Sequence, residues 1–239
     1  MRAIDGYDGR IAVGGNRIGK TMAGAYECNL AIMNDHPLRK YPDSGLGWVV
    51  GLDYNQIESV DLPMFESLMP ESIKSPPSKF YAKNMMWNII TPKGEWQVWF
   101  KSSEAEVDKF SGSKVDFIWF DEEPKKIKIF NECMMRLIDK NGIWWLTGTP
   151  IRGTKWLKDL CNQPYNFDCT GGMMDNPYLP LEKVNTEGAK LSEEEYDVRI
   201  LGRYVLFGGK PVFKMKILND MIALLDKEIP AETGLLRVA

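Results

Sequence analysis

Short apolar runs alternate along the chain with longer segments rich in helix-forming residues. The apolar runs have the length and composition of buried strands, and they are residues 10–13, 47–52, 86–90, 96–100, 117–120 and 143–146. The helix-like segments are residues 20–33, 54–68 and 127–138. Alternating strands and helices are typical of a mainly parallel sheet covered by helices on both faces. The pattern therefore predicts an α/β fold.

Two neighbouring runs differ from the others because no helix-like segment separates them. Residues 86–90 and 96–100 flank residues 91–94, which include Pro92 and Gly94 and are rich in turn formers. We expect these two runs to form a hairpin.

The pattern changes after Pro150, where the helix-like segments become shorter. Residues 156–160 form one such segment, and Ser192 begins another that reaches residue 201. We expect the sheet to end near Pro150. The domains predicted from this change are a core in residues 1–150, a small lid or linker subdomain in residues 151–213, and a C-terminal segment in residues 214–239. The last segment has a helical pattern over residues 217–225 and ends on what looks like the start of a strand.

The composition excludes several classes of protein. With 44% hydrophobic residues in 239, the chain can bury a sizeable core. A net charge of −3 requires neither a nucleic acid nor a membrane as partner, so any contact with DNA must be local. One histidine excludes sites that need two imidazoles, and the four cysteines have no metal-like spacing. No run approaches the roughly 20 apolar residues of a membrane span, which favours a soluble intracellular protein.

The strongest motif lies between the first predicted strand and the first predicted helix. It matches G-x-x-x-x-G-K-[ST] without mismatch, and its residues are Gly14, Gly15, Asn16, Arg17, Ile18, Gly19, Lys20 and Thr21. Glycines in this pattern allow the turn in which successive N–H groups point at phosphate oxygens. Lys20 would reach the β and γ phosphates, and Thr21 would offer its hydroxyl to Mg²⁺. The motif therefore predicts a binding site for a nucleoside triphosphate.

Arg17 lies inside this loop, where an arginine is less common. Its guanidinium can stabilise charge on the γ-phosphate as the bond to it breaks, so Arg17 is a candidate catalytic residue. A solvated loop arginine is the alternative, and the sequence leaves both open.

Two adjacent acids, Asp121 and Glu122, follow the apolar run 117–120. The carboxyl end of such a strand lies beside the phosphate loop in doubly wound folds. Asp121 is then the candidate Mg²⁺ ligand, and Glu122 can polarise the water that attacks the γ-phosphate. The residues between the two motifs contain at least one extra strand, as expected for ATPases that insert a strand between the two motif strands and use a glutamate base. We expect Glu123, the next acid, to be solvated.

A third candidate element, Thr147-Gly148-Thr149-Pro150, follows the run 143–146. It should lie on the same edge of the sheet, where a threonine hydroxyl can sense the γ-phosphate. The alternative is an ordinary turn that ends at proline.

Together these motifs resemble the ATPase domain of bacteriophage terminase large subunits, which package double-stranded DNA. Nearly the whole chain takes part in the resemblance. The stretches that carry it are the phosphate loop at 14–21, the strand and acids at 110–124, the coupling motif at 146–150, and residues 175–179, 202–205 and 208–213.

The resemblance implies a Mg²⁺-dependent ATPase of the additional-strand, catalytic-glutamate type that acts in the host cytoplasm. Its cofactors would be ATP and Mg²⁺, and its partners double-stranded DNA, a portal protein, a small terminase subunit and further copies of itself in a ring. Thr147 and Thr149 would couple hydrolysis to movement of the lid. The chain ends where a nuclease domain would begin, so we expect no DNA cleavage. The family usually has a longer segment before the loop that contributes to the adenine pocket, so adenine recognition stays open.

Two other functions remain compatible with the sequence. One is a helicase-like translocase, which would require a second motor domain or an arginine finger downstream. The other is an interaction module that binds ATP without turnover.

Overall fold

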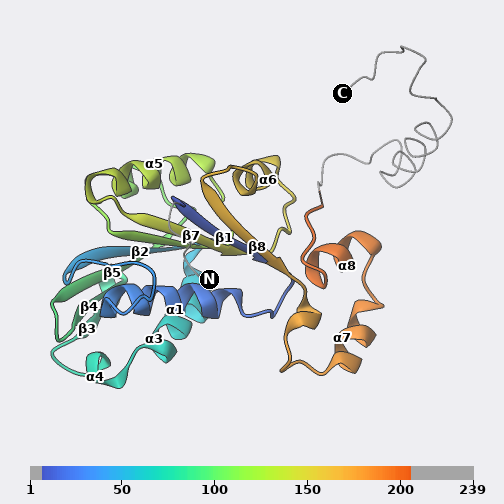
Figure 1. Ribbon diagram of the computed structural model, residues 1–239, viewed down its shortest axis with the longest axis horizontal. Helices are drawn as coiled ribbons and strands as arrows, with labels where there is room; N and C mark the ends of the chain where they lie inside the picture. Colours follow the sequence, from blue (N-terminus) through green and yellow to red (C-terminus); the bar gives the residue numbers. More distant parts are fainter. Residues whose placement is uncertain (1–6, 206–239) are drawn as a thin grey trace, which may run out of the picture. The chain divides into compact units, whose positions relative to one another are not determined.

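The computed structural model describes residues 7–205 of the chain, and these fall within one compact unit (Figure 1). The helix expected at 217–225, the final strand and the expected boundary between residues 213 and 214 lie outside the described residues.

Eight strands form one sheet in the order β3-β4-β5-β2-β6-β7-β1-β8. All neighbours pair in parallel except β3 with β4 and β4 with β5, which are antiparallel. The α/β prediction and the predicted hairpin, which is β4 and β5, are therefore confirmed. The strands are β1 (Gly9–Gly14), β2 (Gly45–Gly51), β3 (Lys79–Tyr81), β4 (Met86–Ile90), β5 (Glu95–Ser102), β6 (Phe117–Asp121), β7 (Ile143–Gly148) and β8 (Asn166–Gly171).

Helices cover both faces of this sheet, as the pattern predicted. In Figure 1, α5 and α6 lie on one face, α1 and α3 lie on the other, and α7 and α8 lie beyond the edge strand β8. No helix in residues 7–205 is long and apolar enough to cross a bilayer. The helices are α1 (Lys20–Met33), α2 (Tyr54–Gln56), α3 (Leu62–Leu68), α4 (Glu71–Lys74), α5 (Ile127–Leu137), α6 (Lys155–Cys161), α7 (Leu181–Gly188) and α8 (Glu193–Arg199), and a π-helical turn (Ile57–Asp61) joins α2 to α3.

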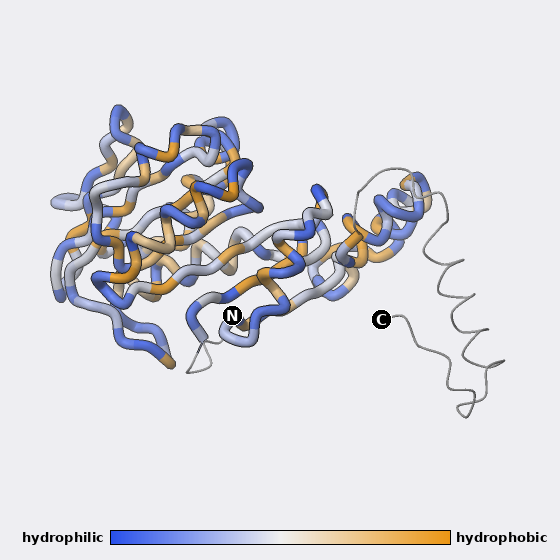
Figure 2. Tube along the Cα trace, turned by 90° about the horizontal axis from the view of Figure 1, so that it is seen from above, coloured by the Kyte–Doolittle hydropathy of each residue, from blue (hydrophilic) through white to orange (hydrophobic). Residues whose placement is uncertain are grey.

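Both faces of the central strands are buried, which explains why these strands are apolar throughout. Along β6, Phe117 and Trp119 pack into the core on the α1 side, whereas Ile118 and Phe120 pack into the core on the α5 side. Since successive strand residues point to opposite faces, a strand between two helical layers needs apolar residues at every position. In the tube of Figure 2, orange hydrophobic stretches run through the body of the molecule, and many of the outer loops are blue and hydrophilic.

One expectation about the sheet was wrong. The sheet does not end near Pro150, because β8 pairs in parallel with β1 at residues 166–171. β8 is an edge strand with alternating exposure, so it lacks the continuous apolar run of a central strand. A strand does lie between β1 and β6, as expected for the additional-strand type, and it is β7, which follows β6 in sequence. The strands that lie between the two motifs in sequence are on the far side of β6.

A buried charge network ties β1 to α1 on either side of the phosphate loop. The Arg10 guanidinium donates to Glu27 Oε2 at 2.9 Å, and His36 Nε2 lies 3.2 Å from the same oxygen. All three side chains are buried, so removing one partner would leave a buried charge without compensation. This network fixes the direction in which α1 leaves the loop.

The close approach of α1 to the sheet depends on Gly24. A Cβ at this position would lie 2.3 Å from Trp119 Nε1, and Trp145 Nε1 donates to the Gly24 carbonyl at 3.1 Å. We expect Gly24→Ala to lower the free energy of unfolding by about 1–3 kcal/mol, although alanine favours helices, because the core cannot accommodate the methyl group. Urea denaturation measures the change. The exposed Met22→Ala on the same helix is the control, and an unchanged stability of Gly24→Ala would contradict the packing argument.

Candidate active site

The phosphate loop connects β1 to α1, and two of its residues have positive φ. Gly19 has φ 99°, and no atom lies within 4 Å of the position that a Cβ would occupy there. Glycine is therefore required at this position by the backbone and not by space. Arg17 has φ 57°, which is uncommon for a residue other than glycine. Lys20 Nζ lies over the loop and donates to the Gly15 carbonyl at 2.7 Å.

The loop and the end of β6 meet at a pair of oxygen donors. Thr21 Oγ1 lies 3.1 Å from Asp121 Oδ2 and 3.3 Å from Oδ1, although 100 residues separate them. A hydroxyl and a carboxylate at this separation fit Mg²⁺, which is bound by one or two carboxylates, hydroxyls, waters and phosphate oxygens. The described residues contain no cluster of three or more His, Cys, Asp or Glu that could hold a metal by protein side chains alone. A metal here would share its coordination with the nucleotide.

Thr147, at the end of β7, occupies the space between these two elements. Its hydroxyl donates to Asp121 Oδ1 at 2.6 Å and accepts a hydrogen bond from Trp119 Nε1 at 2.7 Å. Thr147 is fully buried. The structure thus places the Thr147 hydroxyl against Asp121, and this hydroxyl has no open side from which to contact a phosphate directly.

Thr149 connects the acid side of the site to the phosphate loop. Its N–H donates to Glu122 Oε2 at 2.9 Å, and its hydroxyl donates to Asn16 Oδ1 at 3.2 Å. Glu122 has φ 72°, and its own N–H donates to the Thr147 carbonyl at 2.6 Å. The end of β7 therefore fixes both the backbone and the carboxylate of Glu122.

Burial shifts the pKa values of the charged groups in this site. Burial and the neighbouring charge of Asp121 raise the pKa of Glu122 to about 7. Burial also raises the pKa of Asp121, although hydrogen bonds to its carboxylate oppose the shift. The pKa of Lys20 is lowered by burial, and the charges of Glu122 and Asp121 oppose this change. A carboxyl whose pKa lies near neutrality is well suited to general base catalysis.

Three further residues at the site had no signal in the sequence. Gln56 Nε2 lies 3.3 Å from Asp121 Oδ2, and Asp61 is fully buried close to it. Arg152 donates to the carbonyl of Glu123 at 2.6 Å. Gln56 and Asp61 belong to the helical segment after β2. The spacing of apolar residues in a helix predicts which face is buried, but it does not predict which side chain contacts a distant strand.

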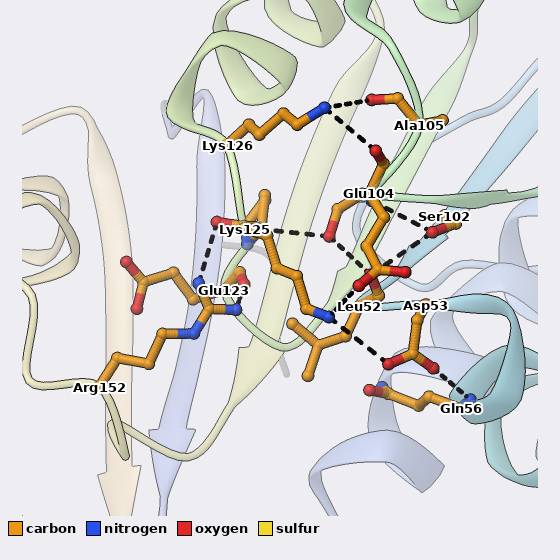
Figure 3. A network of polar contacts seen from close by, with 12 residues as sticks. Leu52, Asp53, Gln56, Ser102, Glu104, Ala105, Glu123, Lys125, Lys126 and Arg152 are labelled. Atoms are coloured by element: carbon orange, nitrogen blue, oxygen red, sulfur yellow. Dashed lines mark hydrogen bonds and ion pairs between the residues drawn. The ribbon is translucent and has the colours of Figure 1, made fainter.

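Glu123 is not solvated, contrary to our expectation. It is 6% exposed, and its carboxylate accepts a hydrogen bond from the Thr154 hydroxyl. Figure 3 shows Arg152 reaching the backbone beside Glu123, while Lys125 bridges Glu104 and Asp53. The chain folds back over the end of β6, so β-strand alternation no longer predicts exposure after Asp121.

Two cavities adjoin the phosphate loop. The first, of about 430 Å³, is lined by Thr21, Gln56, Asp121, Glu122, Glu123, Thr149, Arg152 and three apolar residues. The second, of about 620 Å³, lies between the loop and the α7–α8 region (residues 171–200). Its wall is mainly apolar, and Arg17 is one of its lining residues. The structure therefore places Arg17 on a different cavity from Glu122 and Asp121.

The α7–α8 region is hydrogen-bonded to the phosphate loop. The N–H groups of Gly15 and Asn16 donate to the carbonyls of Gly171 and Arg199 at 2.9 and 2.7 Å. Asn176 Nδ2 donates to the Arg17 carbonyl at 2.6 Å. If this region moved relative to the core, it would therefore either break these hydrogen bonds or displace the phosphate loop with it.

Glu122→Gln should stabilise the protein when metal and nucleotide are absent. A raised pKa means that Glu122 binds a proton more tightly in the folded state than in the unfolded state. The contribution of Glu122 to the unfolding free energy therefore falls as pH rises from the pKa of the unfolded state towards and beyond the folded-state pKa of about 7. We expect the variant to gain about 1–3 kcal/mol in unfolding free energy at pH 8 and less at pH 5. Urea denaturation in EDTA measures this, with the exposed Glu95→Gln as control. An equal gain at both pH values would contradict the raised pKa.

Comparisons with known proteins agree with this geometry. The family model of the terminase large subunit, T4likevirus-type, N-terminal, matches residues 11–204. No curated protein matches the chain. Among solved structures, the large terminase of a thermophilic bacteriophage is similar over 88% of this chain and 52% of its own, with 17% identity and a TM-score of 0.71.

Two further structures show the same fold. The Thermus phage P74-26 large terminase ATPase domain has a TM-score of 0.67 and 16% identity, covering 83% of this chain and 89% of its own. The first terminase in complex with ATP-γ-S has a TM-score of 0.66 and 17% identity, covering 83% and 48%. The chain spans about half the length of that terminase. Since the family model covers most of the chain and the fold is that of P-loop nucleoside triphosphatases, the chain belongs to the T4likevirus-type terminase large subunit family and contains its N-terminal domain.

Proposed function

We propose that this chain hydrolyses ATP with Mg²⁺ and that the hydrolysis powers packaging of double-stranded viral DNA. The contact between Thr21 and Asp121 is the observation that supports hydrolysis most directly, because it joins a phosphate loop to a metal-binding carboxylate. Glu122 lies next to this pair and lines the same cavity. Family membership and the complexes of the thermophilic phage terminase with ADP and ATP-γ-S support the choice of nucleotide.

In the proposed reaction the loop holds the triphosphate through its backbone N–H groups and Lys20. Lys20 leaves the Gly15 carbonyl, its partner in this structure, for the β and γ phosphates. Thr21 and Asp121 would hold Mg²⁺, which neutralises charge on the phosphates when it is bound. Glu122 accepts a proton from the attacking water, and the Thr149 N–H keeps its carboxylate oriented.

We place the nucleoside in the second cavity, beside Asn16 and Arg17. Its apolar wall suits an aromatic base, and its position next to the loop suits a ligand whose phosphates the loop holds. The α7–α8 region would then supply contacts to adenine. Arg17 contacts the nucleotide from this side, and a role of its guanidinium at the γ-phosphate stays a prediction.

The motor function rests on the family and on the link between hydrolysis and the α7–α8 region. Thr149 contacts Glu122 and Asn16, and Asn16 is hydrogen-bonded to Arg199. A structural change that follows loss of the γ-phosphate can therefore be transmitted to the α7–α8 region through a short chain of hydrogen bonds. The proposed partners are DNA, a portal protein, a small terminase subunit and further copies of the chain in a ring.

The first test of this proposal is ATP turnover by the purified chain with Mg²⁺. We expect Glu122→Gln to lower kcat by about 10²-fold or more while nucleotide binding persists, because only the proton acceptor is lost. Lys20→Ala should weaken binding as well. Phosphate release and binding of a fluorescent ATP analogue measure the two effects, with the exposed Glu95→Gln as control. Binding without turnover in the wild-type chain would favour the interaction module.

The nucleoside position can be tested by filling the second cavity. Val184 lies on its wall and is buried on α7. We expect Val184→Trp to weaken ATP binding about tenfold or more but to leave inorganic tripolyphosphate binding unchanged, because only the base loses its site. Competition against a fluorescent ATP analogue measures both ligands. Thr186→Trp, exposed on the same helix, is the control. Equal losses for both ligands would place the base elsewhere.

A further inference from the structure

Gln56 is the last residue of α2 and contacts the candidate metal ligand Asp121. Its Nε2 lies 3.3 Å from Asp121 Oδ2, 3.3 Å from the Asp121 carbonyl and 3.4 Å from Asp61 Oδ1. Asp53 caps this helix by accepting from the Gln56 N–H at 2.9 Å, and Lys125 in turn contacts Asp53 (Figure 3). Asp53 therefore holds the backbone of Gln56, and the Gln56 side chain is directed at the carboxyl groups of Asp61 and Asp121.

Asp61 ends the π-helical turn and is fully buried. Its Oδ1 faces Gln56, and its carboxyl shares a hydrogen bond with the carboxyl of Asp121. Gly51 makes room for this carboxyl, because a Cβ there would lie 2.5 Å from Oδ2. Gln56 and Asp61 therefore both contact the carboxyl group of the candidate metal ligand.

Residues that hydrogen-bond to a metal-ligating carboxylate orient it and change its affinity for the metal. A π turn inserts one extra residue into a helix and changes the direction of the side chains that follow it, and such turns are frequent at functional sites. Here the turn ends at Asp61, whose carboxyl contacts that of Asp121.

We infer that Gln56 and Asp61 are positioning residues of the Mg²⁺ site: Gln56 donates a hydrogen bond to the Asp121 carboxylate, and the neighbouring Asp61 carboxyl fixes the orientation of the same group. This inference rests on the proposed function. It assigns the helical segment after β2 to metal binding, in addition to the loop and the strand ends. A merely structural role would instead let these residues change stability without changing the response to Mg²⁺.

The test measures binding of a fluorescent ATP analogue to the full chain, first in EDTA and then during a Mg²⁺ titration. We expect Asp61→Ala and Gln56→Ala to raise the Mg²⁺ concentration for half-maximal enhancement of binding by about 10-fold or more, with affinity in EDTA unchanged. Asp61→Asn keeps a hydrogen-bond donor beside Asp121 and should titrate closer to the wild type. Glu58→Gln and Asn55→Ala, exposed on the same segment, are matched controls and should titrate like the wild type.

The outcomes separate this inference from the proposed function. Half-saturation within twofold of the wild type in folded Asp61→Ala and Gln56→Ala overturns the positioning role and leaves the ATPase proposal standing. A wild-type chain whose nucleotide binding ignores Mg²⁺ overturns the proposed function and this inference with it. Thermal unfolding in EDTA establishes that each variant is folded.

Discussion

The site depends on one buried carboxylate, that of Asp121, which joins elements far apart in sequence. Thr21 from the phosphate loop, Thr147 from β7 and Gln56 from α2 all contact it. An aspartate with so little exposure is tolerated because polar groups surround it, and each of them has to be in place at the same time. The strand order supplies this arrangement, since β7 separates β1 from β6 and brings its threonine between them.

The buried carboxyl groups of the site oppose stability. Burial raises the pKa values of Asp61, Asp121 and Glu122, so the folded state without metal disfavours the charged forms that a Mg²⁺ site requires. Positive φ at Glu122 adds backbone strain. Strain and desolvation concentrated at one site, within a sheet that is otherwise apolar on both faces, are typical of active sites whose binding partner completes them.

Thr149 and Asn16 give the fold a direct connection between the acid side of the site and the α7–α8 region. Thr149 contacts Glu122, and Asn16 is shared between Thr149 and the Arg199 carbonyl. The connection is short because β8 continues the sheet next to β1 and carries the chain from the core to these helices. Any displacement of these helices would therefore act directly on the hydrogen bonds that Gly15, Asn16 and Arg17 make with residues 171–199.

The sequence by itself determined the elements with strong local signals. The glycines and Lys20 of the loop indicate a backbone conformation, and the apolar run before Asp121 indicates burial, and both are local properties. The alternation of helices and strands likewise predicts the fold class. Tertiary structure alone decided the rest. β8 carries too few apolar residues to be recognised, the place of β7 follows from pairing, and Gln56 and Asp61 reach Asp121 only after β2 has paired with β6. Side-chain contacts between distant segments depend on strand order, and periodicity along the chain does not encode that order.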